Sequence, residues 1–158
     1  MKILITGNLG YVGSELTRFI LKENKKIEII GCDINLYPNT YVKKINYKIK
    51  KQFIKDYRYL DDNDLEGVYA IIHLAAMSND PIGKLITIET HKINYVGVKK
   101  IIKLAKRNKV KKFIFASSCS VYGSAGSFIK SEKDSTKPLT AYAKSKILSE
   151  EFLKKTKG

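Results

Sequence analysis

Apolar residues along the chain form two kinds of pattern, one typical of strands and one typical of helices, and segments of the two kinds alternate. Short runs of isoleucine, leucine, valine and phenylalanine predict strands near residues 2–6, 27–32, 52–55, 70–74 and 112–117. Between them, apolar positions spaced for one helix face predict helices, beginning with the amphipathic stretch from Ser14 to Lys22. Strands that alternate with helices are typical of a parallel sheet covered by helices. The pattern therefore predicts an α/β fold.

The clearest helical pattern runs from about Leu85 to Asn108. Lysines occupy one face of this helix, and the opposite face carries Asn94, Val98, Ile101, Ile102 and Ala105. Burying an amide without a partner costs about 1–3 kcal/mol. Asn94 is therefore expected either to pair with the fold's own backbone or to reach a ligand, and the sequence leaves both readings open.

Length and composition predict one soluble domain. The chain has 158 residues, of which 44% are hydrophobic and 28% charged, enough for a core over residues 1–158. It contains no apolar run of membrane-spanning length and begins directly with a strand, so a cytoplasmic protein is expected. Cys32 and Cys119 lie at predicted strand ends without metal-ligand spacing, which predicts reduced thiols packed as small hydrophobes and no metal site.

The net charge of +15 raises the question of nucleic-acid binding. The densest basic stretch, Lys43 to Lys55, carries six lysines with Tyr47 and Phe53 between them. Nearly all of the 30 basic residues are lysine, however, whereas recognition of bases and phosphates favours the bidentate guanidinium of arginine. Solvated lysine faces are the favoured interpretation, and no nucleic-acid partner is expected.

A glycine-rich turn follows the first predicted strand. Gly7, Gly10 and Gly13 recur at every third residue before a helix begins. Glycines let the backbone turn sharply and approach a ligand closely, and the unpaired N–H groups of a first helical turn attract negative charge. The turn is therefore a candidate pyrophosphate site, with an ordinary turn as the alternative. Its expected contacts are Gly7, Asn8, Leu9, Gly10, Tyr11, Val12 and Gly13.

An acidic residue ends the second predicted strand. Asp33 stands twenty positions after Gly13, where a carboxylate can accept hydrogen bonds from both hydroxyls of a ribose. A carboxylate repels a 2′-phosphate, so Asp33 indicates NAD and not NADP. An ordinary turn aspartate is the alternative.

The fourth predicted strand ends in small residues. His73 is followed by Leu74, Ala75 and Ala76, whose size would let a cofactor lie against the carboxyl edge of the sheet. His73 itself is expected to be a packed histidine at the end of the strand, and His91 a surface residue.

The last predicted strand ends in the hydroxyl-rich segment Ser117 to Gly123, and a polar loop then leads to a helix starting near Pro138 to Thr140. Tyr142 and Lys146 stand one turn apart on that helix. An ammonium favours the ionised form of a nearby phenol, so Tyr142 is a candidate proton carrier. Tyr47/Lys51 and Tyr95/Lys99 share the spacing, and position alone selects Tyr142.

With these motifs the whole chain resembles the extended short-chain dehydrogenase/reductases, specifically the nucleotide-sugar epimerases and dehydratases. The matching features are the TGxxGxxG turn from Thr6 to Gly13, Asp33, Asp56 with Tyr57, the run from His73 to Ala76, Asn94, the segment from Ser117 to Gly123, and Tyr142 to Lys146. The resemblance implies a Rossmann-type doubly wound sheet, NAD as cofactor, a nucleotide-sugar substrate and a homodimer formed through the two long helices.

The resemblance also implies individual roles. Tyr142 is the expected general base, Lys146 contacts the nicotinamide ribose, and Ser118 hydrogen-bonds the reacting sugar hydroxyl at C4. Asp56 and Tyr57 are expected at the adenine. The expected cofactor contacts further include Leu74, Ala75, Ala76, Asn94, Tyr142 and Lys146. The expected substrate contacts are Met77, Ser78 and Ser120, with Asn79 beside them.

Two departures limit what the resemblance implies. The dehydratases place an Asp-Glu pair where this chain has Cys119 and Ser120, which favours epimerisation or simple redox chemistry over dehydration. Family members are also about twice as long, so the last strands and the C-terminal substrate domain are expected to be absent, and the fragment alone to be inactive. The alternatives are an NAD-dependent sugar dehydratase or reductase, or a non-catalytic dinucleotide-binding module that contacts RNA.

Overall fold

The computed structural model describes residues 1–36, 48–78, 86–124 and 129–156. The chain forms two compact units, the first from residues 1–75 and 100–116 and the second from residues 76–99 and 117–158. Leu85, Asn79, Tyr47 and part of the basic stretch from Lys43 to Lys55 lie outside the described residues. The single domain expected over residues 1–158 stays a prediction.

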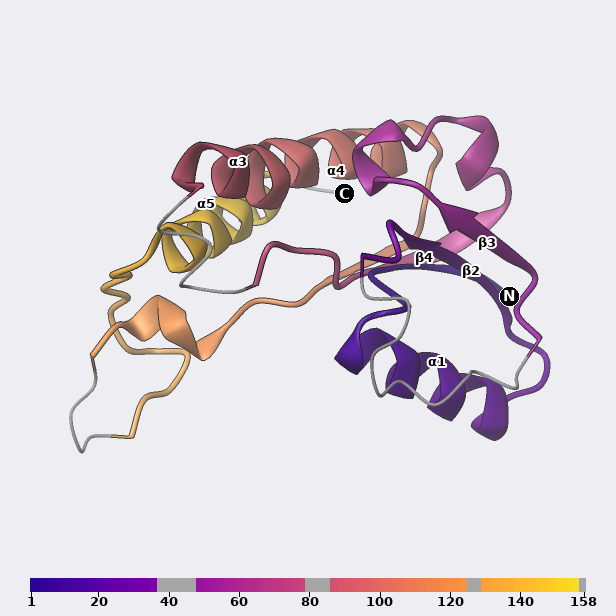
Figure 1. Cartoon of the computed structure of the whole chain (residues 1–158), viewed down its shortest axis with the longest axis horizontal. Helices are drawn as coiled ribbons and strands as arrows, with labels where there is room; N and C mark the ends of the chain where they lie inside the picture. The colour runs from indigo at the N-terminus through magenta and orange to yellow at the C-terminus, as the bar shows by residue number, and fades with distance from the viewer. Residues whose placement is uncertain (37–47, 79–85, 125–128, 157–158) are drawn as a thin grey trace. The chain divides into compact units, whose positions relative to one another are not determined.

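A five-stranded parallel sheet forms the centre of the first unit (Figure 1). Its strands are β1 (Lys2–Thr6), β2 (Glu28–Asp33), β3 (Lys51–Ile54), β4 (Val68–His73) and β5 (Lys112–Phe115). They lie in the order β3-β2-β1-β4-β5, and every neighbouring pair is parallel. The chain thus builds outwards from β1 in both directions, which confirms the Rossmann-type sheet.

The central strands owe their place to continuous apolar runs. Leu4 and Ile5 on β1 and Ile71 on β4 are fully buried, because helices cover both faces of the sheet. The edge strand β5 instead alternates, with Lys112 and Ile114 exposed. All five strands expected from the sequence are present within two residues of their predicted ends.

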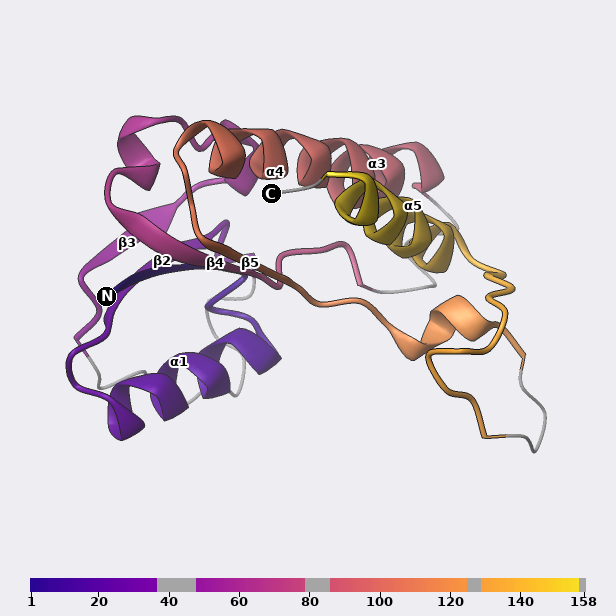
Figure 2. The ribbon, with the colours of Figure 1, turned by 180° about the vertical axis from the view of Figure 1, so that it is seen from behind.

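Helices lie on both faces of this sheet. The helix α1 (Tyr11–Glu23) covers one face, and residues 100–107 of α4 (Val98–Arg107) cover the other (Figures 1 and 2). Ile101, Ile102 and Ala105 form the buried side of α4, as the periodicity predicts, and Leu104 is buried with them. Two short 3₁₀ turns, η1 (Tyr57–Tyr59) and η2 (Asn63–Leu65), join β3 to β4.

The second unit is helical. It contains α3 (Thr87–His91), the π-helical turn η3 (Lys92–Gly97), the 3₁₀ turn η4 (Cys119–Tyr122) and α5 (Ala141–Lys155). Both α3 and η3 pack against α5, and the buried Ser149 of α5 donates its hydroxyl to the backbone oxygen of Asn94, 2.8 Å away. Together with α4, α3 and η3 form a helix from Thr87 to Arg107, which confirms the long helix predicted from about Leu85 to Asn108, and α5 confirms the expected last helix.

The two cysteines differ in their surroundings. Both are free thiols, and Cys32 is buried in β2 as expected. Cys119 is exposed, so its predicted packing as a small hydrophobe is wrong. The strand β5 ends at Phe115, and the chain then turns around the hydroxyl of Ser118, which places Cys119 on the outside of η4.

Candidate functional site

The glycine-rich turn of the first unit depends on the absence of two Cβ atoms. Gly7 has a φ of +76°, and a Cβ there would lie 2.7 Å from the backbone nitrogen of Ala75. A Cβ on Gly13 would lie 2.0 Å from the carbonyl oxygen of Gly7. Both glycines are therefore required for the turn to close and for α1 to begin against it. Leu74 is held beside the turn, because its N–H donates to the oxygen of Thr6 at 3.0 Å.

The first turn of α1 is open to an anion. Gly10 caps the helix without a side chain, and no acidic residue lies in the first turn. Tyr11 and Val12 are exposed, and the first N–H groups of a helix have no partner within it and carry the positive end of the helix dipole. Such an end is a site for phosphate groups.

Asn8 holds the turn from inside the unit. Its side chain is fully buried, and its amide exchanges two hydrogen bonds with the amide of Gln52 on β3, at 2.7 and 3.2 Å. Sequence reasoning did not find Gln52, which stands 44 residues away. A direct contact of Asn8 with the cofactor stays a prediction, and the Asn8 backbone is the part expected to make it.

Asp33 lies beside the same turn. One carboxylate oxygen accepts a hydrogen bond from the N–H of Leu9 at 3.1 Å, and the other accepts one from the N–H of Asn35 at 2.8 Å. The structure thus brings Asp33 and the turn together, as expected. Each carboxylate oxygen can accept a further bond, so the carboxylate is able to receive two ribose hydroxyls.

Asp56 pairs with a partner that sequence reasoning did not find. Its carboxylate accepts hydrogen bonds from the backbone N–H of Arg58 at 2.8 Å and from the Arg58 guanidinium at 2.7 Å. Burial alone would raise the pKa of Asp56, but the bonds from Arg58 outweigh it, so this pKa lies below its usual value. The carboxylate is therefore ionised at neutral pH. The expected contact with adenine stays a prediction.

His73 is a packed residue, as expected. It is fully buried at the end of β4, and its Nδ1 lies 2.7 Å from the hydroxyl of Thr6. The ring meets the buried ring of Tyr57 edge-on, with 4.6 Å between centroids. Burial raises the pKa of Tyr57, which keeps its phenol neutral. His91 is exposed, also as expected.

In the second unit the Asn94 amide serves the fold's backbone. Its Oδ1 accepts from the N–H of Met77 at 2.8 Å, and its Nδ2 donates to the oxygen of Met77 at 2.9 Å. Of the two alternatives that the sequence left open for Asn94, pairing with the fold's own backbone is therefore observed. The π-helical turn around Asn94 carries the amide to this position. Contacts of Asn94 and Ala76 with the cofactor stay predictions, and so does a contact of the exposed Ser78 with the substrate.

Replacing Asn94 by alanine is expected to lower the free energy of unfolding by about 1–3 kcal/mol, because it leaves the N–H and C=O of Met77 unpaired. Denaturant titration of the chain measures this loss. The exposed Asn63 provides the control, and Asn63→Ala is expected to change stability by less than about 0.5 kcal/mol. Equal losses in the two variants would refute the structural role of the Asn94 amide.

The serine segment is organised by its own hydroxyls. Ser118 caps η4, where its Oγ accepts from the N–H of Ser120 at 3.2 Å and lies 2.9 Å from the Ser120 Oγ. The preceding Ser117 donates its hydroxyl to the carboxylate of Glu150 on α5. Two candidate substrate-contacting hydroxyls are therefore paired, and the segment is tied to α5.

Tyr142 and Lys146 lie on the first two turns of α5. Thr140 caps the helix by accepting from the N–H of Ala143 at 3.1 Å. The ammonium of Lys146 lies 5.4 Å from the centroid of the Tyr142 ring, as their spacing predicts. Only 3% of Lys146 is exposed, and this burial lowers its pKa to about 8, against the attraction of Glu150. The pair places a phenol beside a buried cation whose charge is sensitive to pH.

Comparison with known proteins decides the family. The model of the NAD dependent epimerase/dehydratase family matches residues 3–157. The chain belongs to this family. The resemblance inferred from the motifs is thereby confirmed, and so is the expected NAD dependence at the level of the family.

Curated members of the family include both kinds of enzyme. The dTDP-D-glucose 4,6-dehydratase of Dictyostelium discoideum is 33% identical over 78% of this chain and 30% of that protein. The UDP-glucose 4-epimerase of Halalkalibacterium halodurans is 27% identical over 96% of this chain and 45% of that protein. This epimerase/dehydratase chain thus spans less than half the length of either relative.

A solved member has the same fold. The UDP-glucose 4-epimerase of Bifidobacterium longum, determined with NAD⁺ and UDP, superimposes with a TM-score of 0.82 and 26% identity. The superposition covers 98% of this chain and 48% of that one. The similarity therefore extends over nearly the whole epimerase/dehydratase chain described here.

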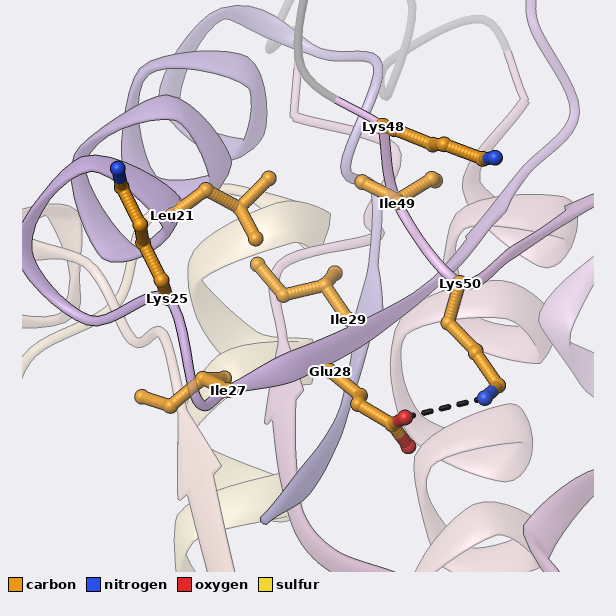
Figure 3. Close-up of a pocket in the computed structure, with 8 residues that line it drawn as sticks. All are labelled: Leu21, Lys25, Ile27, Glu28, Ile29, Lys48, Ile49 and Lys50. Carbon is orange, nitrogen blue, oxygen red and sulfur yellow. Dashed lines mark hydrogen bonds and ion pairs between the residues drawn. The ribbon is translucent and has the colours of Figure 1, made fainter.

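A surface hollow of about 540 Å³ lies in the first unit (Figure 3). It is lined by Leu21, Lys25, Ile27, Glu28, Ile29, Lys48, Ile49 and Lys50, with Lys50 paired to Glu28 at 3.0 Å. The hollow lies at the amino end of β2, whereas the glycine turn and Asp33 lie at carboxyl ends. Because ligands of parallel sheets bind at carboxyl ends, the hollow is not part of the candidate site.

Within the described ranges, no group of three or more histidine, cysteine, aspartate or glutamate residues could hold a metal ion. No helix in the same part of the chain is long and apolar enough to cross a bilayer.

Proposed function

We propose that this chain is the NAD-binding part of an enzyme that epimerises a nucleotide sugar by transient oxidation at C4. The observation that carries the proposal is the closed glycine turn with the carboxylate of Asp33 fixed at its Leu9 N–H. Such a turn supports a bound pyrophosphate, and the carboxylate supports an adjacent ribose. The lack of Cβ atoms at Gly7 and Gly13 lets this turn close and lets α1 begin against it.

The reaction needs a base for a sugar hydroxyl. A bound NAD would supply a reversible hydride acceptor for C4. Tyr142 removes the proton of the C4 hydroxyl and gives it back when the ketone is reduced from its other face. Lys146 keeps positive charge beside the phenol, which favours the ionised tyrosine. Ser118 donates a hydrogen bond to the reacting oxygen, and Ser120 supports Ser118.

The residue at position 119 favours epimerisation over dehydration. Cys119 stands where a dehydratase needs an acid to expel water, and its thiol is exposed. A thiol is a weaker acid than a carboxylic acid and is therefore a poorer proton donor to a leaving hydroxyl. Met77 and Ser78 are proposed to contact the sugar. A homodimer and a cytoplasmic location stay predictions.

The cofactor preference has its own test. NAD is expected to bind more tightly than NADP in titration calorimetry, because the Asp33 carboxylate repels a 2′-phosphate. Asp33→Asn removes the charge and is expected to lower the ratio of NAD affinity to NADP affinity about tenfold or more. Glu23→Gln removes an exposed charge of the same helix-and-strand unit and should leave the preference unchanged. Tighter binding of NADP by the unaltered chain would contradict the proposal.

A further inference from the structure

Glu150, in the second unit, has no role in the proposed reaction but lies close to residues that do. It lies one helical turn after Lys146 on α5 and is partly buried, with 28% of its side chain exposed. One carboxylate oxygen accepts the hydroxyl of Ser117, which directly precedes Ser118. The other lies 4.0 Å from the ammonium of Lys154. Glu150 therefore contacts the serine segment and stands next to the buried cation.

A nearby counter-charge stabilises the protonated form of Lys146. Its side chain is almost completely buried, and taking an ammonium out of water disfavours its charged form. Glu150 acts against this cost. Burial, Glu132 and then Glu150 raise the pKa of Tyr122 on η4. On the η3 side the charged Lys99 lies over the ring of Phe152.

We propose that Glu150 is a positioning residue for the candidate catalytic pair, Tyr142 and Lys146. Its carboxylate holds Lys146 in the charged form, and the hydrogen bond from Ser117 fixes that carboxylate in place. Its importance for catalysis rests on the proposed function, but its effect on Lys146 does not. The hydrogen bond from the Ser117 hydroxyl leaves Glu150 able to act as an anion toward Lys146 on the preceding turn of α5. The same carboxylate thus links the proton-handling pair to the hydroxyl segment.

The protonation of Lys146 can be followed directly in the ligand-free chain. With lysine labelled at ¹³Cε, the Lys146 resonance is expected to titrate near pH 8, apart from solvated lysines that titrate near 10.4. Its absence in Lys146→Met assigns it. Glu150→Gln keeps an acceptor for Ser117 but loses the charge, so the midpoint is expected to fall by about one pH unit.

Two further variants complete the test. Glu151→Gln changes the same charge on the exposed neighbouring position and should leave the midpoint unchanged. Glu150→Asp retains the charge on a shorter side chain and should restore part of the shift. An unchanged or higher midpoint in Glu150→Gln would overturn the proposal. In the complete gene product, the same variant is expected to lower turnover at pH 7 about twofold and to shift the alkaline limb of its pH profile to lower pH. An inactive unaltered enzyme with the expected midpoint shift would instead contradict the proposed function.

Discussion

Turnover by the complete gene product is expected to fall by about 10²–10⁴-fold when Tyr142 is replaced by phenylalanine. The substitution removes one hydroxyl and leaves the ring that lies 5.4 Å from the Lys146 ammonium. The fold should therefore survive, and nucleotide-sugar binding should change little. Steady-state kinetics with UDP-glucose and UDP-N-acetylglucosamine as probes would show the loss in kcat and not in KM.

The chain provides a matched control for this variant. Tyr95 and Lys99 repeat the same spacing, and the Lys99 ammonium lies 5.1 Å from the centroid of the Tyr95 ring. Tyr95→Phe is expected to leave kcat within about twofold of the unaltered enzyme, because Tyr95 lies on η3 and not on the helix after the serine segment. Undiminished activity of Tyr142→Phe, or an equal loss in both variants, would refute the assignment of the base.

Replacing Gly13 by alanine is expected to abolish measurable NAD binding and to destabilise the fold by about 1–3 kcal/mol or more. Alanine ordinarily favours a helix over glycine by about 1 kcal/mol, so the propensity alone predicts the opposite sign. The steric conflict decides, because the new Cβ would lie 2.0 Å from the backbone oxygen of Gly7. Neither backbone can yield without opening the turn.

Gly10 offers a graded comparison in the same turn. A Cβ there would lie 3.3 Å from the same Gly7 oxygen, which requires a shift of only a few tenths of an ångström. Denaturant titration and calorimetry with NAD should therefore rank Gly10→Ala between the unaltered chain and Gly13→Ala. Equal affinity for NAD in all three proteins would show that the turn does not hold the cofactor.

Local patterns predicted most of the fold and the glycine turn. A run such as Lys2 to Thr6 is apolar because both faces of its strand are covered, and the stop at Gly7 is required by the backbone itself. Asp33 was also predictable from local sequence, because the end of a parallel strand fixes where the side chain at that end lies. These features depend on neighbours in sequence.

Partners distant in sequence could not be predicted. Gln52 reaches Asn8 across 44 residues, and Glu150 reaches Ser117 across 33. Many polar residues could have supplied these groups, and only the packed fold selects one. The exposure of Cys119 was missed because the strand was expected to continue to residue 117, whereas the Ser118 hydroxyl caps a turn that ends the extended backbone.

The path of one hydrogen atom tests the central proposal most directly. The complete gene product, supplied with NAD, is incubated with UDP-glucose or UDP-N-acetylglucosamine carrying deuterium at C4, and the sugar products are read by NMR. If C4 is oxidised and reduced again as proposed, the epimer forms with its deuterium still at C4, because the hydride returns to the carbon it left. An epimer that has lost its deuterium to solvent, or deuterium found at another carbon of the sugar, would contradict epimerisation by transient oxidation at C4.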